Sequence, residues 1–412
     1  MNNKSPINAQ SFVLALNSGT STLKFSLFHQ ESLHKQWSGL ISGIGETLGY
    51  MELTDSHGRV QQQKEAHYRN MEDASFAIIS WLQDNIKQCQ ISSIGYRVTQ
   101  GGTVHRKPEV IDQHLLQDLK LLTYPDPNQM RLEIMMITTF MDEYPKLLHV
   151  ACFDTNFHQD MSETNKYYAL PAKYRAQGLM RNGAHGLSCE YIMQKLNSCH
   201  AFINQKKIII AHLGSRSSLT SVKDGKCFDT TCGVSTYGGM VMGSGSGDLD
   251  PGAILFILQK NDLTPEELDV ELGSESGLKA LAGTGDIIQL LKSAAQDKRA
   301  EEAINRYCYQ AQKFIGALAA GLGGLDLLIF TGGIGENSPQ IRERICSSLS
   351  FLGINIDHMQ NLHSEKLISG RNAGVIVRVM ATDEAMMIAI HTRGELYSAG
   401  AKETLTKLPI SV

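Results

Sequence analysis

Short apolar runs alternate with longer segments of mixed polarity along this chain, a pattern that favours an α/β fold. Near the N-terminus, FVLALN (12–17) and LKFSLF (23–28) flank the polar stretch SGTST and predict a β-hairpin. A second hairpin is predicted where KIIIAHLG (207–214) and SLTSVKDGK (218–226) flank SRS, with an Asp-Gly pair closing its far end. From about Thr382, TDEAMMIAIHTRGELYSA predicts a helix with an apolar face and acidic residues in its first turn.

The two predicted hairpins resemble each other. Each has a β-rich run, then a polar residue (Asn17 or His212), then a glycine two positions on (Gly19 or Gly214), then hydroxyl side chains and a second strand. Because they lie about half a chain apart, they indicate either a duplicated fold with one hairpin in each half or two unrelated hairpins.

A third pattern joins a strand to a helix through glycines. LDLLIF (325–330) predicts a buried strand, and TGGIGENS follows it before the predicted helix PQIRERICSSLSFLG (339–353). We expect Ser338 as the N-cap, Pro339 at the first helical position and Gly353 at the end of the helix. The glycine-rich turn can present free backbone N–H groups to an anion, or it can need glycine for its geometry alone.

Composition narrows the class of protein. A chain of 412 residues has room for two domains, and 38 basic against 42 acidic residues is too even to indicate a nucleic-acid or membrane-surface partner. No apolar run approaches the ~18 residues that a membrane helix needs, and the polar first ten residues do not begin a signal peptide. The eight cysteines form no C-x-x-C pair, so we expect free thiols in a soluble, cytoplasmic protein.

Six ordered motifs resemble the acetate kinase (acetokinase) family, which shares a fold with sugar kinases, Hsp70 and actin. LNSGTSTLKF is similar to N-x-G-S-S-S-L-K-F, GYRVTQGG to G-H-R-V-x-H-G-G, and VACFDTNFHQDM to F-D-T-A-F-H-x-T-M, with Asn156 as its main change. HLGSRSSLTSVKDGKCFDTTCG, FTGGIGENSPQIRERI and TDEAMMIA are similar to three further family motifs. The resemblance covers about residues 12 to 392.

This resemblance implies an acetate kinase fold of two actin-like (ribonuclease H-like) α/β domains with a cleft between them. The first domain would comprise 1–154 and 386–412, and the second, nucleotide-binding domain 155–385. The implied reaction is a reversible transfer of the ATP γ-phosphoryl group to the carboxylate of acetate or another short-chain acid, giving an acyl phosphate. The resemblance also implies Mg²⁺ or Mn²⁺ as cofactor, ATP or ADP and a short-chain carboxylate as ligands, and a homodimer.

The resemblance assigns roles to individual residues. Asn17 and Glu384 occupy the positions that organise the metal ion, and Arg97 the position that holds the substrate carboxylate. Asp154 would orient that arginine or the transferred group. His185, in NGAHGLS, matches the histidine that hydrogen-bonds the transferring phosphoryl group.

Further positions would contact the nucleotide or the acid. The implied nucleotide-binding residues are Lys24, His212, Gly214, Ser215, Arg216, Asp286, Gly333, Gly335, Glu336 and Asn337. The acid pocket, besides Arg97, would contain Thr99, Tyr124, Ala184 and Thr236. Ala184 and Thr236 stand where the family has phenylalanine and proline, which would make the pocket wider and more polar. The segment with Asp286 is one residue short, and Ile288 stands where an arginine is usual.

The chain also departs from the family at charged positions. In VMGSGSGDLDP, Gly245 stands where the second catalytic arginine belongs, and Pro125 replaces a family histidine. Ser215 and Arg216 replace asparagine and glycine in the phosphate hairpin. Two interpretations remain open. Either Arg216 is a relocated cation in an enzyme for a larger or more polar acid, or it is an exposed charge at a hairpin tip. In the second case the protein is a catalytically impaired homologue that binds nucleotide and has a regulatory or partner-binding role.

Overall fold

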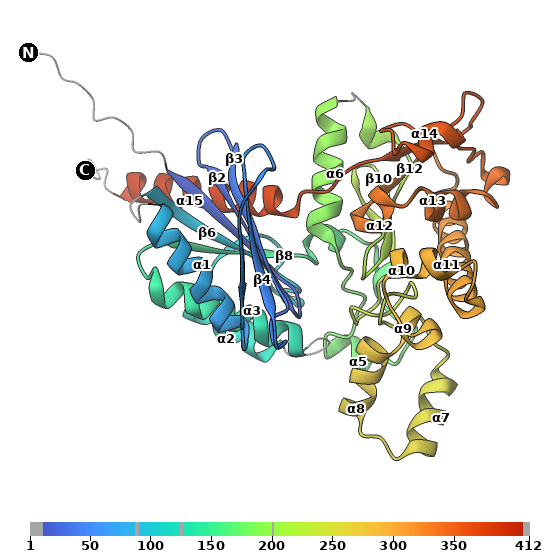
Figure 1. The fold of residues 1–412 in the computed structure, drawn as a ribbon, viewed down its shortest axis with the longest axis horizontal. Helices are drawn as coiled ribbons and strands as arrows, with labels where there is room; N and C mark the ends of the chain where they lie inside the picture. The colour runs from blue at the N-terminus through green and yellow to red at the C-terminus, as the bar shows by residue number, and fades with distance from the viewer. Residues whose placement is uncertain (1–10, 87–89, 123–126, 200–201, 407–412) are drawn as a thin grey trace, which may run out of the picture. The chain divides into compact units, whose positions relative to one another are not determined.

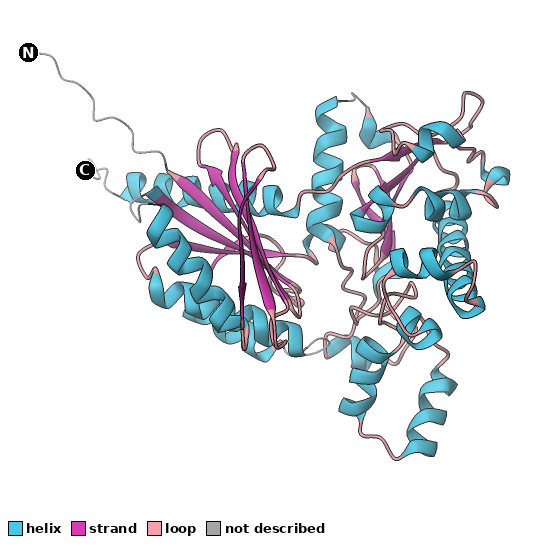
Figure 2. Ribbon diagram, in the orientation of Figure 1, coloured by secondary structure: helices cyan, strands magenta, loops and turns pink. Residues whose placement is uncertain are grey.

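The fold is described from a computed structural model of the chain. The described residues are 11–86, 90–122, 127–199 and 202–406. The chain separates into two compact units, which are treated one at a time below (Figures 1 and 2). Unit 1 comprises Met1–Asn156 with Asp383–Val412, and unit 2 comprises Phe157–Thr382.

Unit 1 is built on one mixed sheet. Within the described ranges its strands are β1 (Phe12–Ser18), β2 (Thr22–His29), β3 (Lys35–Ser42), β4 (Gly49–Asp55), β5 (Val60–Ala66), β6 (Ile91–Val98), β7 (Glu109–Val110) and β8 (Leu148–Phe153). Their spatial order is β5-β4-β3-β2-β1-β6-β8-β7. The β1, β6 and β8 strands are parallel, and the other neighbouring pairs are antiparallel.

Helices cover both faces of this sheet. They are α1 (Met71–Asn85), α2 (Gln113–Leu121), α3 (Pro127–Glu143) and α15 (Glu384–Thr406). Phe12, Leu14 and Leu16 alternate along β1 into a core shared with α1 and α3, and α15 packs across β1, β6 and β8 on the other face. The close approach of α15 explains Gly95 on β6, because a Cβ there would lie 1.9 Å from Thr392 Oγ1.

Unit 2 contains a second mixed sheet. Its strands, among the described residues, are β9 (Ile208–His212), β10 (Ser218–Lys223), β11 (Lys226–Thr230), β12 (Leu327–Thr331) and β13 (Ile376–Val379). The order is β11-β10-β9-β12-β13, with β9, β12 and β13 parallel. Ile208 and Ile210 pack in a core with α6, whereas Ile209 and Ala211 pack in a core with α11, so β9 is apolar on both faces.

The helices of unit 2 vary widely in length. They are α4 (Glu163–Lys166), α5 (Ala172–Ala176), α6 (Gly186–Cys199), α7 (Pro251–Asn261), α8 (Pro265–Val270), α9 (Gly277–Ala282), α10 (Ile287–Ser293), α11 (Lys298–Leu322), α12 (Gly332–Asn337), α13 (Pro339–Cys346) and α14 (His358–Leu362). Shorter helical turns occupy η2 (Asn156–His158), η3 (Ile203–Gln205), η4 (Glu271–Glu275) and η5 (Ser350–Leu352).

The two sheets share one topology. The order β3-β2-β1-β6-β8 in unit 1 matches β11-β10-β9-β12-β13 in unit 2, and both have antiparallel hairpins on one side and parallel strands on the other. This identity favours the duplicated fold over two unrelated hairpins. The predicted Asp-Gly turn is also present, because Asp224 (φ 52°) and Gly225 (φ 75°) both have the positive φ that a tight hairpin turn requires.

One predicted element differs from the structure. TGGIGENS is not an open turn but the short helix α12, and the next helix, α13, begins at Pro339 as predicted but ends at Cys346 instead of Gly353. Ser347 Oγ donates to Arg344 O at 2.9 Å, which satisfies a terminal carbonyl at the start of the serine-rich stretch that follows the helix. Gly353, with φ 85°, instead ends the turn η5. Ser338 precedes the helix, but its side chain makes no capping hydrogen bond.

Candidate active site

Three candidate residues lie at the carboxyl edge of the parallel strands in unit 1. Asn17 is near the end of β1, Arg97 near the end of β6, and Asp154 directly follows β8. The register pairs Leu16 with Tyr96 and Arg97 with Cys152, so these strand ends are neighbours. Strand alternation places all three on the face that α15 covers. This explains how residues far apart in the sequence meet.

Arg97 is held as a fixed cation at this edge. Its Nη2 and Nε donate to Asp154 Oδ2 at 2.8 and 3.2 Å, and Nη1 lies 3.6 Å from Glu133 Oε1. Burial alone would lower the pKa of Arg97, but the carboxylates of Asp154, Glu133 and Glu384 raise it above its ordinary value. The guanidinium therefore stays charged and oriented, as recognition of a carboxylate requires.

Glu384 brings a further carboxylate to the same edge. It is the first residue of α15, and Asn17 Nδ2 donates to Glu384 Oε2 at 2.8 Å across 367 positions of sequence. Asp383 accepts the Met386 N–H at 2.9 Å and so caps the helix. A carboxylate and a carboxamide offer the hard oxygen ligands that Mg²⁺ and Mn²⁺ prefer, together with phosphate oxygens of a substrate. Within the described ranges, no group of three or more His, Cys, Asp or Glu could hold a metal ion.

Lys24 and Thr99 are the other described candidates in unit 1. Lys24 is exposed on β2 and pairs with Asn17 across the β1–β2 ladder. Thr99 is buried, and both its N–H and its hydroxyl donate to Glu133. Tyr124 and Pro125 lie outside the described residues.

Glu133 was not anticipated from the sequence. It lies fully buried on α3 beside the predicted carboxylate site. Its signal was a single acidic residue inside the otherwise mostly apolar stretch LEIMMITTF. A charge in such a stretch needs partners if it is buried.

In unit 2, His185 and His212 come together. Their rings stack at 4.2 Å with an interplanar angle of 11°. His185 Nδ1 hydrogen-bonds Ser218 Oγ at 2.9 Å, and His212 Nδ1 hydrogen-bonds Ser188 Oγ at 2.8 Å. His185 has a φ of 57°, a left-handed conformation that is rare outside glycine and often found at functional sites.

A third histidine supports the segment that precedes His185. His158 Nε2 donates to Ala184 O at 2.8 Å, and the same ring lies 2.2 Å from where a Gly183 Cβ would be. Gly183 also has a φ of 78°. Glycine is therefore required on two counts, and His158 fixes the position of Ala184 directly before His185.

The hairpin turn between β9 and β10 holds Arg216 in place. Arg216 is half-buried, and its Nη1 donates to Thr236 Oγ1. Gly214 N–H donates to Ser217 Oγ at 3.2 Å, which closes the turn. The guanidinium is thus bound to a candidate acid-pocket residue, so Arg216 is not an exposed charge at a hairpin tip.

The GSGSGD segment with Gly245 packs beside this turn. Gly243 N–H donates to Ser215 O at 2.9 Å, and Met242 N–H donates to Gly245 O at 3.0 Å. Gly247 has a φ of 71°, and its N–H donates to Tyr237 O at 3.0 Å. The segment is therefore a pinned loop, and it places the missing-arginine position near the turn that carries Arg216.

Most backbone donors of the TGGIGENS segment are already used. Ile334 and Gly335 N–H donate to Leu213 O at 2.8 and 3.2 Å, and Gly332 N–H donates to Glu336 Oε1 at 2.9 Å. Gly332 has a φ of 78°, and a Cβ there would lie 2.7 Å from Leu213 O. Of the two interpretations of this turn, the structure favours glycine for geometry over a cradle of free amides at these three positions.

The remaining nucleotide candidates in unit 2 also have local partners. Asn337 Nδ2 donates to Gly333 O at 3.0 Å. Asp286 is exposed, and its Oδ1 accepts the Ile288 N–H at 2.8 Å, which caps α10. Asp286 therefore has a structural role as the N-cap of α10.

Arg342 is a second residue that the sequence did not assign. It is fully buried on α13, and its Nη1 donates to Gly335 O and Glu336 O at 2.8 and 2.9 Å. Its Nε and Nη2 donate to Asn361. Burial lowers the pKa of Arg342 to about 10. This arginine holds the end of α12 and with it the candidate nucleotide segment.

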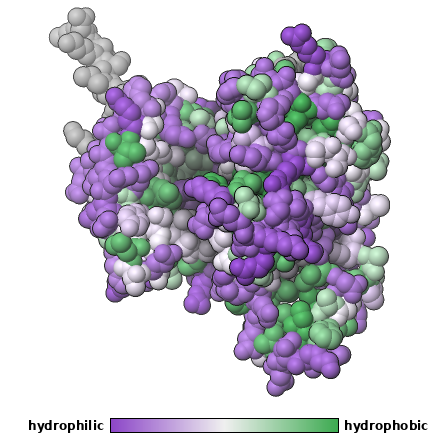
Figure 3. All heavy atoms as spheres, turned by 45° about the vertical axis from the view of Figure 1, so that its right-hand side comes forward, coloured by the Kyte–Doolittle hydropathy of each residue, from purple (hydrophilic) through white to green (hydrophobic). Residues whose placement is uncertain are grey.

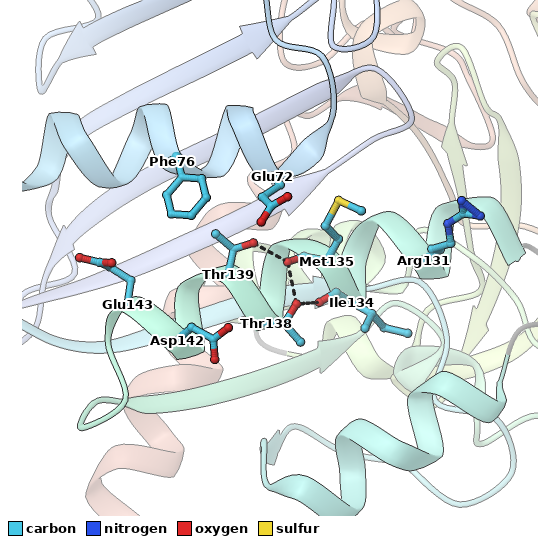
Figure 4. A pocket seen from close by; sticks show the side chains of 9 residues that line it. All are labelled: Glu72, Phe76, Arg131, Ile134, Met135, Thr138, Thr139, Asp142 and Glu143. Atoms are coloured by element: carbon cyan, nitrogen blue, oxygen red, sulfur yellow. Dashed lines mark hydrogen bonds between the residues drawn. The ribbon is translucent and has the colours of Figure 1, made fainter.

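A pocket of about 540 Å³ lies away from the candidate residues. Figure 4 shows side chains of α1 and α3 facing one another across it, with Phe76 and Glu72 on α1. None of the residues predicted for the site contributes to its lining.

Acetate and propionate kinases are among the known proteins similar to this chain. The acetokinase family model matches residues 12–390. An acetate kinase of Nitrobacter hamburgensis is 33% identical over 386 residues, 92% of this chain and 95% of that protein. The structure of a propionate kinase from Francisella tularensis has a TM-score of 0.86 at 32% identity, covering 93% of this chain and 99% of the other. For Porphyromonas gingivalis acetate kinase the TM-score is 0.83 at 29% identity, covering 94% and 100%.

Proposed function

Because the chain belongs to the acetokinase family, we propose that it transfers the γ-phosphoryl group of ATP reversibly to the carboxylate of acetate or another short-chain acid. A carboxylate oxygen attacks the γ-phosphorus, the bond to the β-γ bridging oxygen breaks, and acyl phosphate and ADP leave. One observation carries the proposal: Arg97, fixed by Asp154, lies at a strand edge beside the Asn17–Glu384 pair. A carboxylate-binding cation and oxygen ligands for a metal ion thus share one edge. The comparisons give no support to the alternative of an impaired homologue.

In this reaction the residues of unit 1 bind and orient. Arg97 binds the substrate carboxylate through its guanidinium fork, and Asp154 fixes the orientation of that fork. Glu384 and Asn17 would hold Mg²⁺ or Mn²⁺, which when bound neutralises charge on the ATP phosphates. The hydrogen bond between these two side chains supports the assignment, since it keeps both at the same place.

The residues of unit 2 would stabilise charge on the transferred group. His185, fixed by Ser218 and by stacking on His212, would hydrogen-bond the phosphoryl oxygens. The nucleotide would contact Lys24 of unit 1 and a set of unit 2 residues. That set is His212, Gly214, Ser215, Asp286, Gly333, Gly335, Glu336 and Asn337.

Arg216 would supply the cation that Gly245 cannot. Two observations support this relocation: the guanidinium is bound at Thr236, and the turn that carries Arg216 is hydrogen-bonded to the loop that carries Gly245. A nearby cation would stabilise charge that develops in the transition state.

The acid is proposed to be larger or more polar than acetate. Ala184 lacks a bulky side chain, and Thr236 presents a hydroxyl. Both features would admit an acid with an additional methylene or a polar substituent. Thr99 is a further proposed contact of the acid, and Tyr124, which is also proposed, lies outside the described residues.

We also infer a homodimer in the cytoplasm. The α7 helix has the apolar run AILFIL, yet no residue of it is buried, and Leu255 and Phe256 are 57% and 61% exposed. Figure 3 shows hydrophobic residues gathered at the lower end of unit 2, where Figure 1 places α7 and α8. A second copy would cover this surface.

The described cysteines are free thiols, as in a reducing compartment, and no helix in the described ranges is long and apolar enough to span a bilayer.

Trapping of acyl phosphate with hydroxylamine tests the reaction and names the acid. Mg-ATP would be supplied with acetate, propionate, butyrate, and a set of hydroxy and dicarboxylic acids. Turnover with at least one acid is expected, and the acid with the highest kcat/KM describes the pocket. Absence of acyl phosphate with every acid, in protein that binds ATP, would contradict the proposal.

A further inference from the structure

Glu133 is a buried carboxylate to which the proposed reaction gives no role. Its side chain is 1% exposed. Oε2 accepts the Thr99 N–H at 2.9 Å, and Oε1 accepts from Thr99 Oγ1 and from Gln129 Nε2 at 3.0 Å. Gln129, one turn earlier on α3, also donates to Ser18 O at 2.9 Å. A buried carboxylate is unfavourable without partners, so the hydrogen bonds from Thr99 and Gln129 stabilise Glu133 at the strand edge.

The Nη1 end of the Arg97 guanidinium lies beside the Glu133 carboxylate. Nε and Nη2 of Arg97 both donate to one oxygen of Asp154. Nη1 lies 3.6 Å from Glu133 Oε1, beyond hydrogen-bond distance, and among the described residues none accepts a hydrogen bond from Nη1. The Nη1 end of the guanidinium therefore remains for a substrate carboxylate, which would then lie close to Glu133.

The charges at this edge are unbalanced. Asp154, Glu133 and Glu384 all act on the single guanidinium of Arg97. In the described part of the chain, Arg97 is the charged group that faces Glu133, while Thr99 and Gln129 supply neutral donors. A bound substrate would add a fourth carboxylate. Two carboxylates that share one site do not both ionise at their ordinary pKa.

Burial favours the neutral form of Glu133. It raises the pKa of this carboxyl above its ordinary value, although Arg97 and the donors from Thr99 and Gln129 act in the opposite direction. Glu133 therefore keeps a proton to a higher pH than an exposed glutamate does.

We propose that Glu133 is a positioning residue that gates Arg97 by its protonation: the substrate carboxylate binds Nη1 when Glu133 is neutral, and is repelled when Glu133 is ionised. The proton comes from solvent and remains on Glu133, so no covalent step is involved. The proposal rests on the proposed function and adds which state of the site accepts the acid. KM for the acid should rise about tenfold per pH unit once Glu133 ionises, because only the neutral fraction is competent.

Steady-state kinetics of the full chain test the gate. KM for propionate and for ATP would be measured between about pH 6 and 9, where the acid itself stays ionised. The variants are Glu133→Gln, which retains an oxygen for the Thr99 N–H but no charge, and Glu143→Gln as control. Glu143 is on the last turn of the same helix, where it accepts from Gln83 Nε2.

The expected result is a change confined to the acid. In the unaltered chain KM for propionate rises with pH, whereas in Glu133→Gln it is flat and lies below that of the unaltered chain at the alkaline end. KM for ATP stays constant in both, and Glu143→Gln behaves like the unaltered chain. The same pH dependence in Glu133→Gln as in the unaltered chain, or a loss of thermal stability with unchanged KM, would overturn the gate.

Calorimetry separates this inference from the reaction. Propionate would be titrated into the protein in two buffers of different ionisation enthalpy, which counts protons taken up on binding. Proton uptake that Glu133→Gln abolishes, without any acyl phosphate formed, would support the gate and refute the reaction. Turnover with a KM for propionate that does not change with pH would support the reaction and refute the gate. Failure of propionate and of every other acid to bind would refute both.

Discussion

Replacing Arg216 with alanine should remove most of the activity. The guanidinium is half-buried and donates to Thr236, and its turn is hydrogen-bonded to the loop of Gly245. An arginine that stabilises the transition state of phosphoryl transfer contributes roughly 10³- to 10⁵-fold in rate, or about 4 to 7 kcal/mol. The hydrogen bond from the charged guanidinium to Thr236 contributes only about 1.5 to 3 kcal/mol to stability. The variant should therefore fold normally and lose at least about 10³-fold in kcat.

The assay compares kcat by hydroxylamine trapping in four proteins. These are the unaltered chain, Arg216→Ala, the double variant Arg216→Ala/Gly245→Arg, and Arg175→Ala as an exposed control that pairs with Glu163. The double variant should recover part of the loss. Recovery is incomplete because a Cβ at position 245 would lie 3.0 Å from Tyr237 Cβ and must displace it by a few tenths of an ångström. If Arg216→Ala keeps kcat within about tenfold of the unaltered chain, the relocation of the cation is refuted.

Three further predictions concern the supports of the site. Arg342→Met should lower the free energy of unfolding by about 3 kcal/mol or more, because it leaves the Gly335 carbonyl and other buried acceptors unpaired. Chemical denaturation measures this free energy, and a change below about 0.5 kcal/mol would refute the prediction. Gly183→Ala should reduce both melting temperature and kcat, since the added Cβ meets the His158 ring at a positive φ; normal values of both would contradict the packing argument. Glu384→Gln should raise the concentration of Mg²⁺ needed for half-maximal activity by about tenfold or more, with KM for the acid less affected; an unchanged Mg²⁺ requirement would remove this residue from the metal site.

The sequence predicted the fold well where pattern and motif agree. The α/β class, both hairpins, the buried strand before TGGIGENS and the helix after Thr382 are all present, and the resemblance to acetate kinases is confirmed. The duplication was only one of two interpretations, because strand order is a long-range property that local periodicity does not contain.

The end of α13 was predicted wrongly, since the helix ends at Cys346, before the glycine that was expected to close it. At this end the Ser347 hydroxyl donates to the Arg344 carbonyl. Residue propensities give little weight to such a local hydrogen bond between a side chain and the backbone. Gly353 has the expected positive φ but belongs to a separate turn.

Among site residues, the sequence indicated those that carry motifs and missed those that support them. The apolar stretch around Glu133 indicated that this residue could be buried, but nothing local identifies Arg97 as its partner, and nothing local identifies Asn361 as the partner of Arg342. Likewise, two of the amides considered for TGGIGENS, those of Ile334 and Gly335, donate to the carbonyl of Leu213, which directly follows β9, and only the folded sheet creates this contact.

The central claim is that Arg97 binds a carboxylate that receives phosphate from ATP. Its most direct test is phosphorus NMR of Mg-ATP and the preferred acid with the unaltered chain, Arg97→Ala, and Arg131→Ala as an exposed control in the same unit. We predict an acyl phosphate signal with matching ADP for the unaltered chain and the control, and none for Arg97→Ala. An acyl phosphate signal of equal size from Arg97→Ala, or none from the unaltered chain, would contradict the account.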